Sequence, residues 1–494
     1  MRARPLAGTS LVLALAIAGK LSGQPSPRDD AARLVSAMLG DTPLVSDLQW
    51  LSDRIGGRAT GSPANLRAVE WGLERFREMG VEARREAFQM PGLWLERAAS
   101  VVISGNGVRF TPRVAAMPFS AATPSSGTSG PLLDAGFGAE SDFKRLGSSA
   151  RGAFVLVDVP ELTDIAGLFR EYTDAHLIEN RADSAGVAGV VYVGSRPRDV
   201  LFRHNVWAGL ANRKPMLVVE RDGGLRALRL LRAGVPLTIT ETIDIQSGGP
   251  YESHNVVGEV RGSTRPEEIV LLGAHLDAWD LGDGALDNGA NVALVLDVAR
   301  QIKRLGLRPA RTIRFVLWNG EEQGLRGSQG YARSHAAELD RHVVTVTYDI
   351  GCGRVTGFFT GGRPEVAAAT TRLLAPVAGL GPFTQVDIPI VGTDNFDFMI
   401  EGVATLVANQ EPASYGPNYH ARSDTFDKCD TRELRLNSAS AAALVYGFAQ
   451  DQQSLARQTR AQIEELMRTT DLPDQMRTFN VWADWEQARR GRAR

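Results

Sequence analysis

Short apolar segments alternate with amphipathic helical segments over the second half of the chain, and this alternation constrains the fold most. Strands are expected at 268–274, 312–318, 342–348 and 405–408, with helices at 291–305, 327–337, 364–377 and 437–452. Near-continuous apolar strands separated by helices are typical of a parallel sheet that is covered on both faces. We predict an α/β fold with a doubly wound sheet, mixed but mostly parallel, and helices on both faces.

A second, smaller α/β domain is expected before this region. Residues 121–130 are rich in Ser, Thr, Gly and Ala, which marks a boundary near Phe119. Apolar strand-like segments alternate with helical patterns from there to residue 250. We predict that the larger domain comprises residues 28–118 and 251–455, that the insert spans 119–250, and that 456–494 form a polar tail.

The chain begins with the pattern of a secretory signal peptide. Arg2 and Arg4 precede an apolar run at 6–18, and small residues at 16–18 or at 21–23 offer cleavage sites. A membrane anchor is the alternative, but the run is shorter than the ~20 residues that span a bilayer. We predict a signal peptide at residues 1–23 and a secreted or periplasmic protein with no membrane contact after cleavage.

The charge balance and the cysteine content limit which partners and which metal ligands are expected. The 494 residues include 55 basic and 57 acidic side chains, a net charge of -2, which gives no support for a nucleic-acid partner. Two cysteines exclude a disulfide scaffold and a Cys-rich zinc fold. Any metal chemistry must therefore use His, Asp and Glu.

Residues of the kinds that bind metals follow four of the predicted strands. In chain order they are His275, Asp277 and Asp287, then Glu321 and Glu322, then Asp349, and finally Tyr419 and His420. Sites in doubly wound sheets lie outside the carboxyl ends of the strands, so these side chains should meet at one edge.

Two histidines and three carboxylates suit two Zn²⁺ ions. Asp287 is the natural bridge between the ions, with His275 and Asp349 completing one site and Glu322 and His420 the other. Water held between two such ions would lose a proton near neutral pH and attack a carbonyl as hydroxide.

Two further carboxylates are left for other tasks. Glu321 adjoins the ligand Glu322 and is free to act as general base, taking the proton of the water and passing it to the leaving amine. Asp277 lies two residues beyond His275, where its carboxylate could accept the other ring N–H and fix the tautomer.

Structural alternatives exist for each residue, since adjacent glutamates are common on solvated faces and Asp349 could cap a helix. No Gly-x-Ser-x-Gly turn, phosphate-binding loop or His-Glu-x-x-His is present at a suitable place, which leaves serine hydrolases, P-loop enzymes and single-helix zinc peptidases unsupported. We expect the remaining histidines without carboxylate companions to be structural: His176, His204, His335 and His342.

The segments 273–289, 317–324, 392–396 and 420–425 resemble the M28 family of zinc aminopeptidases and carboxypeptidases, most nearly its plasma glutamate carboxypeptidase branch. The resemblance covers the mature chain and implies a zinc-exopeptidase fold, the ligand roles given above, a protease-associated-like insert and a possible homodimer. It also implies a cis peptide bond between Asp287 and Asn288.

Two departures bear on specificity. Asn288 stands where near relatives often have Asp, and residues 410–418, where substrate termini should be read, match poorly. Tyr419 resembles the Tyr-His-x-x-x-Asp-Thr pattern of glutamate carboxypeptidases, in which the phenol stabilises the tetrahedral oxyanion. The alternative is a tyrosine that only packs on its loop.

These observations predict an exported di-zinc exopeptidase that hydrolyses dipeptides or short peptides. Alternatives are an aminopeptidase on longer peptides, a single-zinc cyclase of the same fold, and a receptor or binding protein of this fold that has lost its metals. The filled ligand positions disfavour the last two.

The two cysteines fall near ligands. Cys352 follows Asp349 by three residues and Cys429 follows His420 by nine, so convergence of the ligands could bring the thiols within bonding range. A disulfide would persist in an oxidising compartment. Two separate buried thiols are the alternative.

Overall fold

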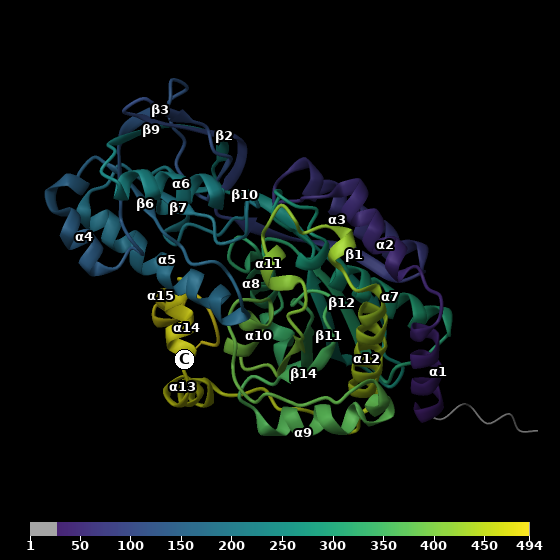
Figure 1. Ribbon diagram of the computed structural model, residues 1–494. Helices are drawn as coiled ribbons and strands as arrows, with labels where there is room; N and C mark the ends of the chain where they lie inside the picture. The colour runs from purple at the N-terminus through teal and green to yellow at the C-terminus, as the bar shows by residue number, and fades with distance from the viewer. Residues whose placement is uncertain (1–26, 494) are drawn as a thin grey trace, which may run out of the picture.

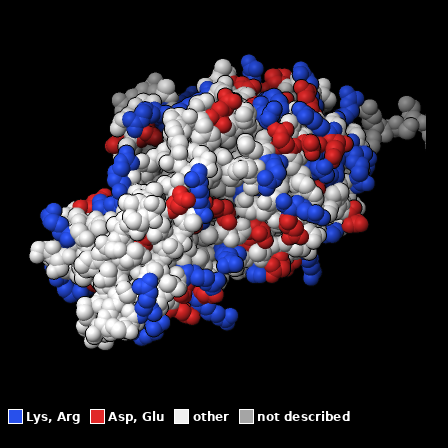
Figure 2. Space-filling model, turned by 90° about the horizontal axis from the view of Figure 1, so that it is seen from above, with Lys and Arg blue, Asp and Glu red and all other residues white. Residues whose placement is uncertain are grey.

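The computed structural model describes residues 27–493 (Figure 1). The predicted signal peptide therefore lies outside the described residues. Within the described part of the chain, no helix combines the length and apolar character that a membrane crossing requires. On the face seen in Figure 2, basic and acidic side chains are interspersed and form no continuous basic surface of the kind that binds a phosphate backbone.

The larger domain is built on a mixed seven-stranded sheet. Its order is β1 (Glu82–Met90), β10 (Tyr251–Val260), β12 (Arg311–Trp318), β11 (Arg265–His275), β13 (His342–Thr347), β15 (Thr405–Gln410) and β14 (Val355–Phe359). The four central strands β12, β11, β13 and β15 are parallel to one another, whereas the pairs β1–β10, β10–β12 and β15–β14 are antiparallel. The predicted mixed sheet with a parallel centre is confirmed.

Helices cover both faces of this sheet. One face packs on α1 (Pro27–Leu39), α2 (Leu44–Trp50), α3 (Pro63–Glu78), α7 (Ala290–Arg304) and α12 (Thr431–Gln450) in the largest apolar core. The other face carries α8 (Arg326–Ser334) and α10 (Asn395–Ile400), where Trp318, Tyr331 and Phe398 pack together. Helix α9 (Pro364–Leu373) lies at the lower edge in Figure 1.

The insert has its own eight-stranded sheet. The order is β3 (Val108–Phe110), β2 (Leu93–Gly105), β9 (Leu237–Gly248), β5 (Thr128–Asp134), β6 (Phe154–Val157), β7 (Gly189–Val193), β8 (Met216–Val219) and β4 (Val114–Ala116). The neighbouring helices are α4 (Glu140–Leu146), α5 (Ile165–Ala185) and α6 (Arg221–Arg232).

The boundary predicted at residue 119 was wrong. Strands β2 to β4 already belong to the second sheet, because β2 pairs with β9 along most of its length. The Ser- and Gly-rich segment at 121–130 leads into β5 within the insert rather than separating two domains. The second sheet therefore begins at Leu93.

The predicted polar tail is folded. It forms α13 (Arg460–Thr469), α14 (Leu472–Thr478) and α15 (Trp482–Glu486), which lie beside α5 and α10 in Figure 1. Ile463, Met476 and Trp485 are buried against Phe396 of α10, while Arg468, Arg477 and Arg489 are exposed. The C-terminal segment is therefore amphipathic, and its apolar side packs against the larger domain.

Candidate metal centre

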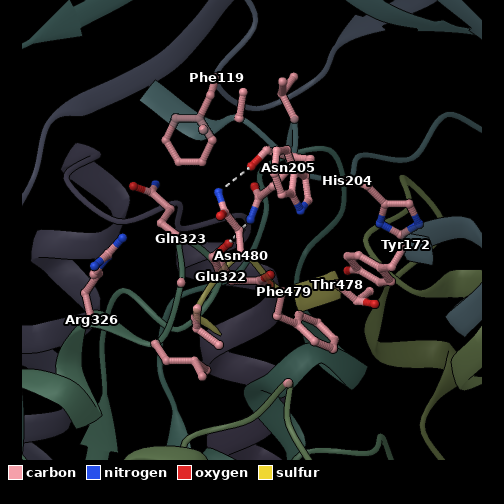
Figure 3. A pocket seen from close by; sticks show the side chains of 18 of the residues that line it. Phe119, Tyr172, His204, Asn205, Glu322, Gln323, Arg326, Thr478, Phe479 and Asn480 are labelled. Carbon is pink, nitrogen blue, oxygen red and sulfur yellow. Dashed lines mark hydrogen bonds between the residues drawn. The ribbon is translucent and has the colours of Figure 1, made fainter. Parts of the chain in front are cut away.

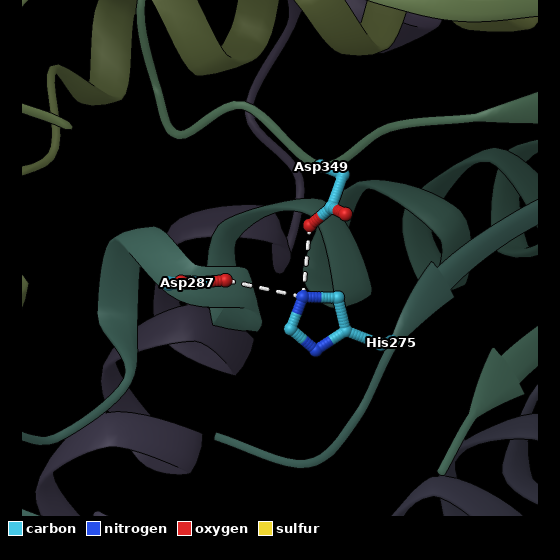
Figure 4. A group of neighbouring side chains, drawn as sticks. All are labelled: His275, Asp287 and Asp349. Carbon is cyan, nitrogen blue, oxygen red and sulfur yellow. Dashed lines mark ion pairs between the residues drawn. The ribbon is translucent and has the colours of Figure 1, made fainter. Parts of the chain in front are cut away.

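The first predicted ligand group converges at the carboxyl ends of β11 and β13. His275 ends β11, Asp349 follows β13, and Asp287 lies in the turn before α7, where the Asp287–Asn288 peptide bond is cis as expected. His275 Nε2 is 3.1 Å from Asp287 Oδ1 and 2.8 Å from Asp349 Oδ1 (Figure 4). All three side chains are buried.

The second group shares Asp287. His420 Nε2 is 3.3 Å from Asp287 Oδ2 and 2.8 Å from Glu322 Oε2. One carboxylate of Asp287 therefore directs one oxygen to each histidine. The structure brings all five predicted ligands together in two overlapping groups.

Hydrogen bonds on the far sides of the two rings show what these groups can hold. Nδ1 of His275 is 2.9 Å from the Asp277 carbonyl oxygen, and Nδ1 of His420 is 2.9 Å from the Arg203 carbonyl oxygen. A carbonyl only accepts, so each Nδ1 carries a proton and donates. In the neutral ring the Nε2 lone pair then faces carboxylate oxygens, an arrangement that suits a metal ion bound between them.

Electrostatics agree with this assignment. Burial lowers the pKa of His420, but Glu322 and Asp287 raise it more, to about 10. The field that draws a proton to this ring would equally draw a divalent cation. Within residues 27–493, Asp287 Oδ2 and Glu322 Oε1 are buried without a hydrogen-bond partner. The donor set therefore fits a pair of metal ions.

The predicted role of the Asp277 carboxylate was wrong. It lies 3.8 Å from His275 Nδ1, whereas the main-chain oxygen of Asp277 accepts the bond. The backbone turns directly after β11, so its carbonyl reaches the ring first. The carboxylate instead accepts from Thr60 Oγ1 at 2.7 Å and from the Glu321 N–H at 3.4 Å, and so helps to place Glu321.

Glu321, the residue expected to act as general base, adjoins the ligand Glu322. It lines the same cavity as Glu322 and His420. Burial raises its pKa well above the ordinary value, and the neighbouring Asp349 and Glu322 carboxylates raise it further. A carboxyl with a raised pKa binds a proton more readily, which suits a group that takes a proton from water and passes it on.

Several supporting residues escaped the sequence reasoning. Asp424 accepts the N–H groups of Leu286 (2.7 Å) and Asp287 (3.1 Å), and burial raises its pKa to about 7. The fully buried Arg58 donates to the carbonyls of Leu276 and Gly284. Asp424 lies within the segment 420–425 that resembles the family, whereas no local sequence pattern indicates a role for Arg58.

A further buried carboxylate lies nearby. Asp394 is 1% exposed, and burial raises its pKa well above its ordinary value, with Asp349 and Asp277 adding to the effect. The segment 392–396 that contains it was recognised as part of the family likeness, but no role followed from the sequence.

Tyr419 joins the metal centre to the insert. Its ring stacks on His420 at 3.7 Å, and its hydroxyl lies 2.8 Å from that of Tyr172 on α5. His204 Nε2 is 2.6 Å from Glu171 Oε2, and Arg196 donates both to Glu171 and to the Tyr419 carbonyl.

The histidines expected to lack carboxylate companions divide in the structure. His204 has a carboxylate companion, Glu171, contrary to the expectation, and it lines the cavity that also contains Glu321 and Glu322. His335 also has carboxylate partners, Glu86 and Glu338, but does not line this cavity. Glu171 and Glu86 lie far from their histidines in the sequence, and Glu338 lies three residues after His335.

A cavity of about 390 Å³ opens onto Glu321, Glu322 and His420. Three parts of the chain form its wall: the turn after β12, the insert through Tyr172, His204 and Asn205, and the C-terminal segment through Thr478, Phe479 and Asn480 (Figure 3). Residues 410–418, expected to read substrate termini, do not line it.

Comparison with known proteins agrees with this geometry. Residues 255–445 match the model of peptidase family M28. Carboxypeptidase Q of Rattus norvegicus is 27% identical over 418 residues, covering 83% of this chain and 86% of the relative. The probable lipoprotein aminopeptidase LpqL of Mycobacterium tuberculosis is 26% identical over 458 residues, covering 84% and 85%.

Solved structures share the fold. A peptidase M28 precursor from Shewanella amazonensis superposes with a TM-score of 0.77 at 24% identity, covering 87% of this chain and 98% of that one. BSAP, a zinc aminopeptidase from Bacillus subtilis, gives 0.66 at 22% identity, covering 84% and 96%. The matched family model covers residues 255–445, so the segment that holds the converged ligands is similar to peptidase family M28.

Proposed function

We propose that this protein is an exported di-zinc exopeptidase that hydrolyses dipeptides and other short peptides. The similarity to M28 peptidases and to carboxypeptidase and aminopeptidase relatives indicates a metallo-exopeptidase; the number of zinc ions, the substrate length and the export are the proposal. The observation that carries it is Asp287, whose two carboxylate oxygens face two different histidines within two overlapping ligand groups.

The side chains around this centre would have separate roles in peptide hydrolysis. Two bound zinc ions would polarise the scissile carbonyl and make a water acidic enough to attack at neutral pH. The Glu321 carboxylate would take the proton of the attacking water and deliver it to the leaving amine. Tyr419, stacked on His420, would donate its hydroxyl proton toward the developing oxyanion, with Tyr172 holding the phenol in place.

The cavity favours short substrates. Its volume of about 390 Å³ falls near the lower end of the ~300–1,000 Å³ typical of small-molecule sites. Walls from the insert and the C-terminal segment surround the approach to Glu321 and Glu322. A dipeptide suits this space better than a long extended chain.

Export is supported by two observations. The N-terminal pattern resembles a cleaved signal peptide, and the Cys352–Cys429 disulfide suits an oxidising compartment. We therefore place the mature protein in the periplasm or outside the cell. The resemblance to carboxypeptidase Q also motivates a homodimer as the form to look for in solution.

An aminopeptidase is the second candidate, favoured by the names of the LpqL and BSAP relatives. A non-catalytic receptor of the same fold would have no reason to keep all five ligands and Glu321. Free Ala-Ala, acetyl-Ala-Ala, Ala-Ala-amide and a pentapeptide separate the possibilities, with the chelated protein as control.

The expected result is rapid hydrolysis of free Ala-Ala and slow hydrolysis of the other three. Turnover of the amide and the pentapeptide at similar rates would identify an aminopeptidase, and turnover of the acetylated peptide a carboxypeptidase. A zinc-loaded protein that cleaves none of them would overturn the exopeptidase proposal.

A further inference from the structure

Two polar side chains on one wall of the active-site cavity have buried polar atoms without hydrogen-bond partners. Gln323 is 5% exposed, and within residues 27–493 neither its amide oxygen nor its amide nitrogen makes a hydrogen bond. Arg326 Nε is likewise buried without a partner, and the guanidinium makes one side-chain bond, to Gln329 at 3.3 Å. Both residues line the cavity that contains Glu321 and Glu322.

The turn between β12 and α8 places these two side chains together. Gly324 has φ of 104° and Leu325 has φ of 62°, so the chain reverses within two residues before α8 begins at Arg326. Figure 3 shows Gln323 and Arg326 on one side of the cavity, with Glu322 between them and the pair Tyr172 and His204 in this view.

The charge of Arg326 is not neutralised locally. Arg490 is close to it but is held by Asp397 in two bonds of 2.7 Å, and Asp484 pairs with Arg489. Among the described residues Arg326 itself forms no ion pair. One positive charge therefore remains on a wall whose opposite end is the carboxylate-rich metal centre.

Unpaired buried polar groups cost free energy, so a ligand that pairs with them gains affinity. A guanidinium edge beside an amide N–H₂ presents parallel donors that match the two oxygens of a carboxylate. Asn205 adds a buried amide oxygen without a partner, while its amide nitrogen donates to the Glu322 carbonyl at 2.7 Å. That oxygen can accept an N–H of the same ligand.

We propose that Arg326 and Gln323 bind the α-carboxylate at the C-terminus of the substrate. The inference rests on the proposed exopeptidase function and refines it: a dipeptide would place its scissile carbonyl at the metal centre and its carboxylate on Arg326. The enzyme then requires a free C-terminus one residue beyond the scissile bond, as a dipeptidase or a carboxypeptidase does and an aminopeptidase does not.

The test compares Ala-Ala, Ala-Ala-amide and Ala-Asp-amide in four proteins: wild type, Arg326→Gln, Arg326→Lys and the control Arg333→Gln. Arg333 lies on the same helix but is exposed and outside the cavity. Loss of a charged hydrogen bond of ~1.5–3 kcal/mol predicts a ~10–100-fold lower kcat/KM of Arg326→Gln for Ala-Ala, mostly through KM.

The amide should be hydrolysed by wild type and Arg326→Gln within ~2-fold of each other, because it lacks the group that Arg326 binds. Arg326→Lys should recover part of the loss, and Arg333→Gln should match the wild type. Equal losses on Ala-Ala and its amide would reduce Arg326 to a structural role. Preferred hydrolysis of Ala-Asp-amide over Ala-Ala would assign the subsite to a side-chain carboxylate and overturn the proposal.

A binding arm separates this inference from the proposed function. Calorimetry with the reduced dipeptide Ala-ψ[CH₂NH]-Ala and its amide needs no turnover. Tighter binding of the acid than of the amide by wild type, lost in Arg326→Gln, would support the subsite even if no peptide were hydrolysed. Equal binding of acid and amide by the wild type would refute the subsite, even in an active peptidase.

Discussion

Two adjacent glutamates take different positions at the metal centre. Glu322 faces His420 at 2.8 Å and belongs to a ligand group, while Glu321 lies outside both groups but lines the cavity. The Asp277 carboxylate holds the backbone N–H of Glu321, so that position is fixed by a bond and not only by chain connectivity. These positions agree with the proposed roles, metal binding for Glu322 and proton transfer for Glu321.

Replacing Glu321 by Gln should leave the metal content unchanged and lower kcat by at least ~10²-fold, the usual scale for loss of a general acid–base group. Steady-state kinetics beside metal analysis checks this. Glu267→Gln, on an exposed part of β11, serves as the control. A kcat near the wild-type value in Glu321→Gln would remove the residue from the mechanism.

The five ligands could be predicted because each follows an apolar strand, and strand ends meet at one sheet edge. The hydrogen-bonding partners could not. The ring of His275 is oriented by the main-chain carbonyl of Asp277 and not by the expected carboxylate. Arg58, which donates to the Leu276 carbonyl, lies 218 positions away from it in the sequence. Such contacts depend on tertiary packing that no local spacing encodes.

At the scale of the elements, a disulfide links two of the loops that carry predicted metal ligands. Cys352, three residues after Asp349, is bonded to Cys429, nine residues after His420, with Cα atoms 5.3 Å apart. The bond predicted as one of two possibilities is confirmed. It joins the loop after β13, which carries Asp349 of one ligand group, to the segment before α12, which carries His420 of the other.

Reduction of this disulfide should weaken metal retention while leaving the distant insert folded. Zinc release to a chelator, measured with and without reductant, checks the first part, and hydrogen exchange in β5 to β9 checks the second. The double variant Cys352→Ser, Cys429→Ser is the control for effects of the reductant. Unchanged zinc release after complete reduction would show that the bond does not support the centre.

Glu241 makes the insert sensitive to pH. It is fully buried on β9, facing the core between Ile239 and Ile243, and neither carboxylate oxygen has a hydrogen-bond partner in the described residues. Burial raises its pKa from the ordinary 4.5 to about 8. The folded state therefore favours the protonated form, and its contribution to stability is present below pH ~4.5 and lost as the pH rises toward ~8.

Glu241→Gln should consequently stabilise the protein more at pH 8 than at pH 5, by a difference of about 2–4 kcal/mol in the free energy of unfolding. Urea unfolding at both pH values measures it. Glu252→Gln on β10 alters an exposed carboxylate and should show no such difference. A pH-independent effect of Glu241→Gln would mean that Glu241 is charged in the folded protein.

The central strands were predictable because they are near-continuous apolar runs. Edge strand β1 was not, because its sequence Glu-Ala-Arg-Arg-Glu-Ala-Phe-Gln-Met carries its charges on an exposed edge. The start of the insert was misplaced for a related reason: β2 is long and half exposed, and its membership in the second sheet depends on pairing with β9, which lies far along the chain.

At the scale of the whole molecule, the active-site cavity exists only because three distant parts of the chain meet. Phe479 and Asn480 of the C-terminal segment lie across from the turn at 321–326, and Asn480 donates to the Trp207 carbonyl of the insert at 3.0 Å. The Arg-rich composition of the segment gave no sign of this role, because its apolar residues are buried only through their packing against α10.

The buried pair of Arg490 and Asp397 fastens this segment. Arg490→Ala should destabilise the protein by about 3–5 kcal/mol, because it leaves the Asp397 carboxylate buried and unpaired. It should also raise KM for Ala-Ala by loosening one wall of the cavity. Urea unfolding and steady-state kinetics provide the two readouts.

Arg468→Ala, which removes an exposed arginine of α13, is the matched control and should change neither quantity. Full stability of Arg490→Ala would show that the C-terminal segment is held by its apolar contacts alone. An unchanged KM in a destabilised Arg490→Ala protein would separate the segment from substrate binding.

The central claim is that Asp287 bridges two metal ions, and counting zinc in two purified variants tests it most directly. Mass spectrometry should find two zinc ions per chain in the wild type, close to none in Asp287→Ala, and about one in Asp349→Ala, because only Asp287 belongs to both ligand groups. Equal zinc loss in the two variants, or zinc retained in both, would contradict the account.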